Sequence, residues 1–196
     1  MPQRTASEKD DRRSKLRAAL RIPKDAKAIG FFGKLIDKKN PELLVEAVAK
    51  LPEPARSSTH LLFVGAGELE GRLKELCAEH HLRAHFPGFV NQSAISDYYL
   101  AADLVALPSR YAGETWGLVV NEALHAGCAV IVSEAVGCAV EFGKWERVRV
   151  IPVDDAAACK QAIQTLSEFP RDFDWCAKAM EDYSIRAAAE GLASKL

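Results

Sequence analysis

The chain of 196 residues lacks a long uninterrupted apolar run, and its first twenty residues are too charged for a signal peptide. It also lacks an excess of charge of either sign. Lys and Arg total 26 against 27 for Asp and Glu, so the formal net charge is −1. This balance gives no electrostatic reason to expect nucleic acid or an anionic membrane as a partner. These absences predict a cytoplasmic protein without a spanning helix.

Metal-binding and hydrolytic motifs are also missing. There is no C-x-x-C pair and no H-E-x-x-H spacing, so the sequence predicts no metal site. An odd number of scattered cysteines argues against a disulfide framework and for a reducing compartment, where they would serve as small buried hydrophobes. Neither a G-x-S-x-G elbow nor a P-loop is present, which leaves hydrolase and P-loop kinase functions without support. The five cysteines are Cys77, Cys128, Cys138, Cys159 and Cys176.

What the chain does contain is an alternation of short apolar segments and helical patterns. Because strands that alternate with helices form parallel sheets covered on both faces, we expect an α/β fold. Right-handed crossovers then give a single Rossmann-like, doubly wound parallel sheet of about six strands. The predicted strands are residues 28–32, 60–64, 83–86, 103–107, 129–132 and 147–152, and the predicted helices are 41–51, 69–80, 93–101, 116–126, 155–169 and 172–190.

The ends of the chain differ from this alternating middle. Residues 1–21 are polar, with a short helical tail from about Asp11, and are predicted to be a linker or lead-in. Residues 22–171 form the predicted Rossmann-like domain, and residues 172–196 a C-terminal helical tail. Within the domain, we expect Asn40 and Ser93 to cap helices and Gly127 to end the central one.

The stretch 107–133 is the most informative one. Glu114 and Glu122 stand seven residues apart around Gly117, at a predicted strand-to-helix turn on the ligand-binding edge of the sheet. Their carboxylates suit sugar or ribose hydroxyls, and the free N–H groups near Gly117 suit phosphate. On spacing alone, a simpler alternative is preferred, in which Glu114 only favours the helix N-terminus and Glu122 is solvated.

Two glycine-containing turns lie at the same predicted edge. Gly33-Lys34 and the following Lys38-Lys39 would suit a diphosphate, although a solvated loop explains them equally well. Gly65 and Gly67 resemble half of a dinucleotide fingerprint, but its third glycine would fall at Glu70. NAD binding is therefore not expected. The alternative that these glycines form a tight turn whose backbone a ligand can approach is not excluded.

Five motifs in order carry a family resemblance. They are Phe-Gly-Lys-Leu…Lys-Asn (32–40), Phe-Val-Gly-Ala-Gly (63–67), Phe-Pro-Gly-Phe-Val (86–90), Ala-Asp-Leu-Val-Ala-Leu-Pro-Ser-Arg (102–110) and Glu-Thr-Trp-Gly-Leu-Val-Val-Asn-Glu-Ala (114–123). The chain resembles, over residues 20–190, the C-terminal, donor-binding domain of GT-B retaining glycosyltransferases of glycosyltransferase family 4. The last motif matches that family's E-x7-E signature.

The resemblance implies roles for individual residues. Lys34, in place of a usual arginine, and Lys39 would bind the donor diphosphate, and Glu114 would hold hydroxyls of the transferred sugar. Glu122 would take the ribose hydroxyls. Val90 and Gln92 would border the base. The implied catalytic residues are Glu114, Lys34 and Lys39, and the implied donor-binding residues are Gly33, Val90, Gln92, Thr115, Trp116, Gly117, Leu118, Val119 and Glu122. This class requires no metal and no cofactor besides its nucleotide-sugar substrate.

Some positions depart from the family pattern. Lys34 loses the bidentate fork of arginine, which would weaken diphosphate binding. Asn40 replaces a common glycine, without an obvious consequence in the sequence. The segment after Val136-Gly137 is blurred and looks shortened. The sugar, the acceptor and the choice among UDP, GDP and ADP stay undetermined.

The resemblance covers only one half of a GT-B enzyme. It therefore implies that the acceptor-binding N-terminal domain is missing, and that the isolated chain binds a nucleotide-sugar donor without completing transfer. Peripheral association with the cytosolic membrane face would go through that absent domain. The alternative is a non-catalytic Rossmann-like module that binds a ligand or partner. A sugar-phosphate isomerase is disfavoured, because the E-x7-E helix belongs to the transferases.

Overall fold

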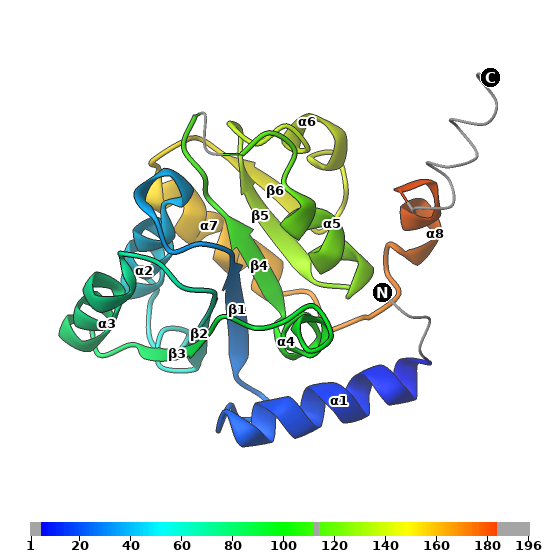
Figure 1. The fold of residues 1–196 in the computed structure, drawn as a ribbon, viewed down its shortest axis with the longest axis horizontal. Helices are drawn as coiled ribbons and strands as arrows, with labels where there is room; N and C mark the ends of the chain where they lie inside the picture. The colour runs from blue at the N-terminus through cyan, green and yellow to red at the C-terminus, as the bar shows by residue number, and fades with distance from the viewer. Residues whose placement is uncertain (1–4, 112–113, 184–196) are drawn as a thin grey trace.

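The computed structural model describes residues 5–111 and 114–183 and contains one parallel sheet of six strands. The strand order is β3-β2-β1-β4-β5-β6 (Figure 1). The predicted α/β, doubly wound Rossmann-like fold is therefore confirmed. The strands are β1 (Lys27–Phe32), β2 (Thr59–Val64), β3 (Arg83–Gly88), β4 (Leu104–Leu107), β5 (Ala129–Ser133) and β6 (Val148–Ile151).

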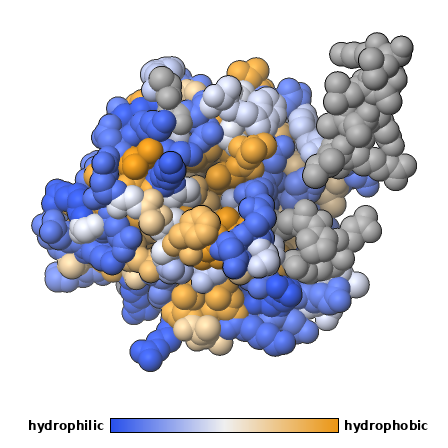
Figure 2. Space-filling model, viewed as in Figure 1, coloured by the Kyte–Doolittle hydropathy of each residue, from blue (hydrophilic) through white to orange (hydrophobic). Residues whose placement is uncertain are grey.

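Helices cover both faces of this sheet. The helices are α1 (Ala6–Ala19), α2 (Pro41–Ala49), α3 (Glu70–Glu79), α4 (Ile95–Ala101), α5 (Leu118–His125), α6 (Ala139–Phe142), α7 (Ala156–Ser167) and α8 (Ala177–Met180), with 3₁₀ turns at Asp37–Lys39 and Glu181–Tyr183. The core on one face joins α2, α3 and α7, and the core on the other joins α4, α5, α6 and α8. Figure 2 shows exposed apolar side chains gathered towards the middle of the face that carries α4 and α5.

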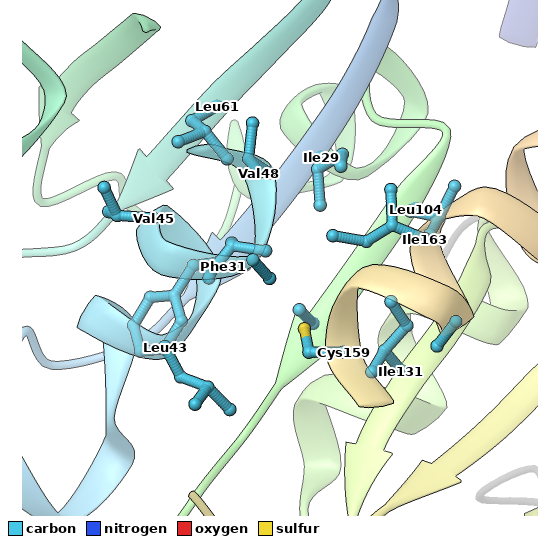
Figure 3. Packing of buried hydrophobic residues seen from close by; sticks show 14 of the residues in the cluster. Ile29, Phe31, Leu43, Val45, Val48, Leu61, Leu104, Ile131, Cys159 and Ile163 are labelled. Carbon is cyan, nitrogen blue, oxygen red and sulfur yellow. The ribbon is translucent and has the colours of Figure 1, made fainter. Parts of the chain in front are cut away.

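The two cores arise from the alternation of side chains along each strand. In β1, Phe31 belongs to the core under α2 and α7, and its neighbour Phe32 belongs to the core under α4. Figure 3 shows Phe31 and Leu61 packed with Val48 of α2, and Ile163 of α7 beside Leu104. A strand buried on both faces needs apolar residues at nearly every position, which is why these segments appear in the sequence as continuous apolar runs.

The N-terminal helix begins earlier than the sequence pattern predicted. It starts at Ala6 instead of near Asp11, because Thr5 and Glu8 form a capping box with bonds of 2.8 and 3.2 Å. Its buried Arg13 and Arg17 reach across to α4 and to Asp103. Whether residues 1–21 act as a linker stays a prediction.

One predicted helix cap, Ser93, is wrong, and the other, Asn40, is correct in position but makes no capping bond. The helix α4 begins at Ile95, and the side chain of Asn91, not that of Ser93, accepts from the Ala94 N–H. Asn40 precedes α2, but its backbone is left-handed (φ 52°) and its side chain makes no cap hydrogen bond. The amide of Asn40 donates instead to Asp154, at 2.8 Å. In both cases a competing side-chain partner decides the geometry.

The C-terminal prediction also needs correction. Residues 172–176 are not helical, and only α8 and the 3₁₀ turn after it form within the described part of 172–190. The Asp172 carboxylate accepts from the Asp174 N–H at 2.9 Å, a local bond that competes with helix formation. The remainder, 184–190, lies outside the described residues.

Other predictions are confirmed. Gly127 ends α5 in a left-handed conformation (φ 75°), and all five cysteines are buried and free. α5 itself starts at Leu118, two residues later than predicted. In the ranges 5–111 and 114–183, no helix is long and apolar enough to cross a membrane.

Candidate functional site

The site lies where the strand order reverses. β1 connects onward to β2 on one side, whereas its other neighbour β4 connects onward to β5, so the loops after β1 and β4 diverge. Ligands of doubly wound sheets bind in the crevice at such a switch point, outside the carboxyl ends of the strands. The loop after β1 carries the predicted lysines, and the loop after β4 carries Glu114.

The centre of the site is an ion pair between these two loops. The Lys39 Nζ lies 2.5 Å from the Glu114 Oε2, and the two side chains are 17% and 21% exposed. The lysine side chain passes over Gly33, where an added Cβ would lie 3.6 Å from Nζ. Gly33 has φ 138°, a conformation that favours glycine. The structure thus brings together three of the predicted residues.

The other predicted lysine is not part of this pair. Lys34 is exposed and has no ion-pair partner among the residues that the structure describes. Its ammonium group is therefore available at the carboxyl edge of the sheet, in the loop after β1. Lysine carries its charge on a flexible stem, so it can reach an anion without a prepared geometry.

The turn before α5 is held against the loop after β5. Gly117 (φ 92°) has no room for a side chain, because an added Cβ would lie 2.7 Å from Val136 Cγ1. An added Cβ on Gly137 would lie 2.2 Å from the Thr115 carbonyl oxygen. The first N–H groups of α5, including those of Leu118 and Val119, have no acceptor within the helix. They are the groups suited to phosphate oxygens.

The side chains around this turn face solvent. Thr115 is exposed, Trp116 is 40% exposed, and Leu118 is 70% exposed. The Trp116 Nε1–H donates to Asn121 Oδ1 at 2.9 Å, which holds the indole beside the start of α5. Exposed apolar groups next to an ion pair give a surface on which a ring could stack.

Glu122 is held from within the core. The buried Tyr99 hydroxyl donates to the Glu122 Oε2 at 2.7 Å, and the Tyr99 ring stacks on Phe32 with centroids 3.9 Å apart. Burial, together with the Glu122 charge, raises the pKa of Tyr99 above its usual range. Glu122 is half-buried, so it is not the purely solvated carboxylate of the simpler alternative.

The remaining predicted residues lie at the same edge but farther along it. Val90 and Gln92 follow β3, which is separated from β1 by β2. Val90 is half-buried against the core that contains Phe32, and Gln92 is exposed. No hydrogen bond or ion pair joins them to Lys39 or Glu114 within the described ranges.

The Gly65 and Gly67 turn has a packing explanation. An added Cβ on Gly65 would lie 1.9 Å from the Gly33 carbonyl oxygen, and one on Gly67 would lie 2.2 Å from that of Leu35. The Leu35 N–H also donates to the Ala66 carbonyl at 3.0 Å. The two glycines therefore allow one backbone to approach another, and they support the site by holding the lysine loop.

Sequence reasoning missed several partners of the site. It assigned no role to Tyr99, Arg110 or Asp154, although Arg110 directly follows the strand β4 and its Pro-Ser turn. The Arg110 side chain contacts both Asp37 and Asp154. The position of Arg110 just after a strand, at the switch-point edge, was the one signal in the sequence that could have marked it as a site residue.

The fold and site define a doubly wound α/β domain with an ion pair and glycine-containing turns at its switch point. Residues 12–184 match the family described as "Glycosyl transferases group 1", so the chain belongs to this family. Its sheet and flanking helices are those of a GT-B glycosyltransferase domain. The resemblance inferred from the five motifs is thereby confirmed at the level of group 1; family 4 stays a prediction.

Individual relatives agree with this assignment. The chain is similar to the uncharacterized glycosyltransferase MJ1607 of Methanocaldococcus jannaschii, with 36% identity over 66% of this chain and 33% of the relative. It is also similar to the D-inositol 3-phosphate glycosyltransferase of Corynebacterium efficiens, with 28% identity over 88% of this chain and 45% of the relative. The chain thus spans less than half of these curated relatives.

Solved structures show the same fold. Sucrose-phosphate synthase from Thermosynechococcus elongatus matches 79% of this chain and 39% of its own, with 30% identity and a TM-score of 0.67. WaaG, a glycosyltransferase involved in lipopolysaccharide biosynthesis, matches 93% of this chain and 49% of its own, with 24% identity and a TM-score of 0.77.

Proposed function

We propose that this chain is the donor-binding domain of a retaining hexosyltransferase, which transfers a sugar from a nucleotide-diphosphate sugar to an acceptor. The observation that carries the proposal is the Lys39–Glu114 pair, 2.5 Å apart at the switch point. A cation for the diphosphate and an acceptor for sugar hydroxyls are adjacent there. Membership of the group 1 glycosyltransferases supports the same chemistry.

In this proposal, donor binding exchanges one set of ionic contacts for another. Lys39 releases Glu114 and, with Lys34, binds the diphosphate, while Gly33 provides the backbone conformation of the turn beneath the Lys39 side chain. Glu114 is then free to accept hydrogen bonds from the sugar hydroxyls. Lys39 and Glu114 each lose the other as a partner and gain a polar group of the donor, which limits the cost of desolvating the two charges.

The start of α5 completes the donor site. The backbone from Thr115 to Val119 offers N–H groups to phosphate, and Gly117 allows the turn that exposes them. Trp116 and Leu118 add exposed apolar surface beside these N–H groups. Glu122, oriented by Tyr99, accepts from the ribose hydroxyls.

The base would lie towards β3. Val90, half-buried, offers its backbone to the base, and the exposed Gln92 amide borders it. A base read through so few groups leaves UDP, GDP and ADP as candidates.

Transfer proceeds with retention of the anomeric configuration. The leaving phosphate assists attack by the acceptor, and the lysine ammonium groups with the α5 N–H groups stabilise the charge that develops on it. No metal or further cofactor takes part in this scheme. The chain spans 33% and 45% of two curated relatives, which supports placing the acceptor-binding half outside it. The isolated chain would then bind the donor and turn over little or nothing.

We further propose that the complete protein works in the cytoplasm, and that any peripheral association with the membrane involves the acceptor-binding domain. Its partners are that domain, the nucleotide sugar and the acceptor, and nucleic acid is not among them.

The test is nucleotide binding by the isolated chain. UDP, GDP and ADP are titrated at millimolar concentrations while the melting temperature is followed; a UDP complex of Anabaena HepE, a chain of the same fold, makes UDP the first probe. A ligand at about ten times its Kd adds about 1.4 kcal/mol, which raises the Tm by about 3–6 °C.

Substitution of Lys39 gives the matched comparison. Because a charge-assisted hydrogen bond contributes about 1.5–3 kcal/mol, Lys39→Ala should weaken binding by roughly tenfold or more. Lys50→Ala removes the same charge from an exposed position after α2 and should leave the Kd unchanged. Absence of a Tm shift with all three nucleotides would instead favour a non-catalytic Rossmann-like module.

A further inference from the structure

Arg110 ties together three loops at the carboxyl edge of the sheet. Its Nε lies 2.9 Å from the Asp154 Oδ1 in the loop after β6, and its Nη1 lies 2.7 Å from the Asp37 Oδ1 in the loop after β1. Its backbone N–H also donates to the Lys38 carbonyl at 2.9 Å. The loop after β4 is thereby fastened to the loop that carries Lys39.

Asn40 supplies a second attachment for the same loop. Its side-chain amide donates to the Asp154 Oδ1 at 2.8 Å, so a single carboxylate oxygen receives both Asn40 and Arg110. Asn40 is 2% exposed, which shields this bond from water on its side. We define Asn40, Arg110 and Asp154 as the loop clamp.

Two members of the loop clamp have an unusual backbone. Asn40 has φ 52° and Asp154 has φ 59°, both in the left-handed region that glycine adopts without strain. Asn and Asp tolerate this region better than other residues with side chains, but still at a cost. Residues keep a strained backbone where the surrounding structure holds them in it, and such residues gather at functional sites. The strain at Asn40 and Asp154 therefore points to a role in function.

The loop clamp encloses the residue at the centre of the site. Lys39 ends the 3₁₀ turn Asp37–Lys39, which Arg110 holds at its first two residues and Asn40 holds immediately after the last. The Lys39 N–H donates within the turn to Ile36, at 3.0 Å. With both ends held, the Lys39 side chain keeps its direction over Gly33 to Glu114.

Exposure argues against stability as the main role of these ion pairs. The Asp37 and Asp154 side chains are 76% and 53% exposed, and Arg110 is 33% exposed. Ion pairs in such positions contribute little to folding. They can still narrow the range of loop conformations, which affects a bound ligand through preorganisation.

We propose that the loop clamp positions Lys39 for the donor diphosphate, with Asn40 and Asp154 acting through the loop without touching the ligand. This inference rests on the proposed function. It assigns a consequence to the side chain of Asn40, namely a bond to Asp154 that a glycine at the same position could not make.

The test uses variants that keep the left-handed backbone. Asn40→Gly and Asp154→Gly each remove a clamp bond and also relieve strain, so the Tm should stay the same or rise. The Kd should nevertheless rise by about threefold to tenfold for whichever of UDP, GDP and ADP binds the unchanged chain most tightly. Affinity and stability then move in opposite directions, which a purely structural role does not produce.

A double variant and a control complete the experiment. Asn40→Gly combined with Asp154→Gly should weaken binding no more than Asp154→Gly alone, because both remove the same bond. Glu53→Gln breaks the exposed pair with Arg56 in the loop before β2, at the opposite edge of the sheet, and should leave the Kd unchanged.

The outcomes separate the two proposals. If the unchanged chain binds no nucleotide, the proposed function fails. If it binds and both single variants bind with the same Kd, the loop clamp has no positioning role and the inference is overturned. The inference is also overturned if the variants that lose affinity have a lower Tm. It is overturned as well if the loss in the double variant equals the sum of the two single losses.

Discussion

Glu114 should hinder the binding of a nucleotide that carries no sugar. Its carboxylate pairs with Lys39, with Nζ and Oε2 2.5 Å apart. A nucleoside diphosphate must break this pair, yet it provides no sugar hydroxyls for the released carboxylate. We therefore predict that Glu114→Gln binds UDP more tightly than the unchanged chain, although the same substitution should severely reduce transfer by the complete enzyme.

The size of this effect follows from the exposure of the pair. The Lys39 and Glu114 side chains are 17% and 21% exposed, between a surface pair and a fully buried one. A pair of this kind contributes about 0.5–1 kcal/mol, which corresponds to a roughly twofold to fivefold decrease in Kd once the competition is removed. Removal of a negative charge beside the diphosphate acts in the same direction.

Isothermal titration calorimetry with UDP measures this change. Glu134→Gln is the matched control, because Glu134 is an exposed carboxylate after β5 at the same edge of the sheet. Its substitution should change the Kd much less. Equal or weaker UDP binding by Glu114→Gln would refute the argument that Glu114 competes for Lys39. An equal gain in affinity in both variants would show that the gain comes from the loss of a negative charge at this edge and not from the release of Lys39.

Two further predictions concern stability, and urea unfolding tests both. Asp103→Ala leaves two buried arginines without their carboxylate and should lower the free energy of unfolding by about 3 kcal/mol. Asp97→Ala breaks a more exposed pair and should lower it by less than about 1 kcal/mol. Equal losses in the two variants would contradict this. Burial foremost, with the nearby His85, lowers the pKa of His60 to about 4. The unfolded chain therefore takes up its proton first, and stability present above about pH 6.5 should fall by about 1–3 kcal/mol towards pH 4. His60→Gln should flatten this decline, and an unchanged decline would exclude His60 as its source.

The sequence alone was sufficient for the architecture because its signals are local. Continuous apolar runs such as the one containing Phe31 and Phe32 require burial on both faces, and their alternation with helical patterns requires a parallel sheet. Left-handed glycines at the ends of elements, such as Gly127, were predictable for the same reason. Helix boundaries were less so, because Asn91 and Asp172 form local side-chain bonds that compete with the helix.

The candidate site was predictable only as a set of residue types. Glu114, Lys39 and Gly33 follow strand ends, so the sequence predicted that they lie at one edge, and the family resemblance assigned their roles. It did not predict that Lys39 and Glu114 pair with each other, or that a core tyrosine holds Glu122. Seventy-five positions separate the lysine from its partner, and no periodic pattern extends over such a distance.

Tertiary structure decided these contacts through the strand order and the packing of loops. The neighbouring positions of β1 and β4 bring the Lys39 loop to the Glu114 loop, and the loop after the edge strand β6 adds Asp154. The sequence determined which segments become strands and helices, because burial and backbone preference act over a few residues. Which side chains meet at their ends depended on the order of the strands, which is a property of the whole packed sheet.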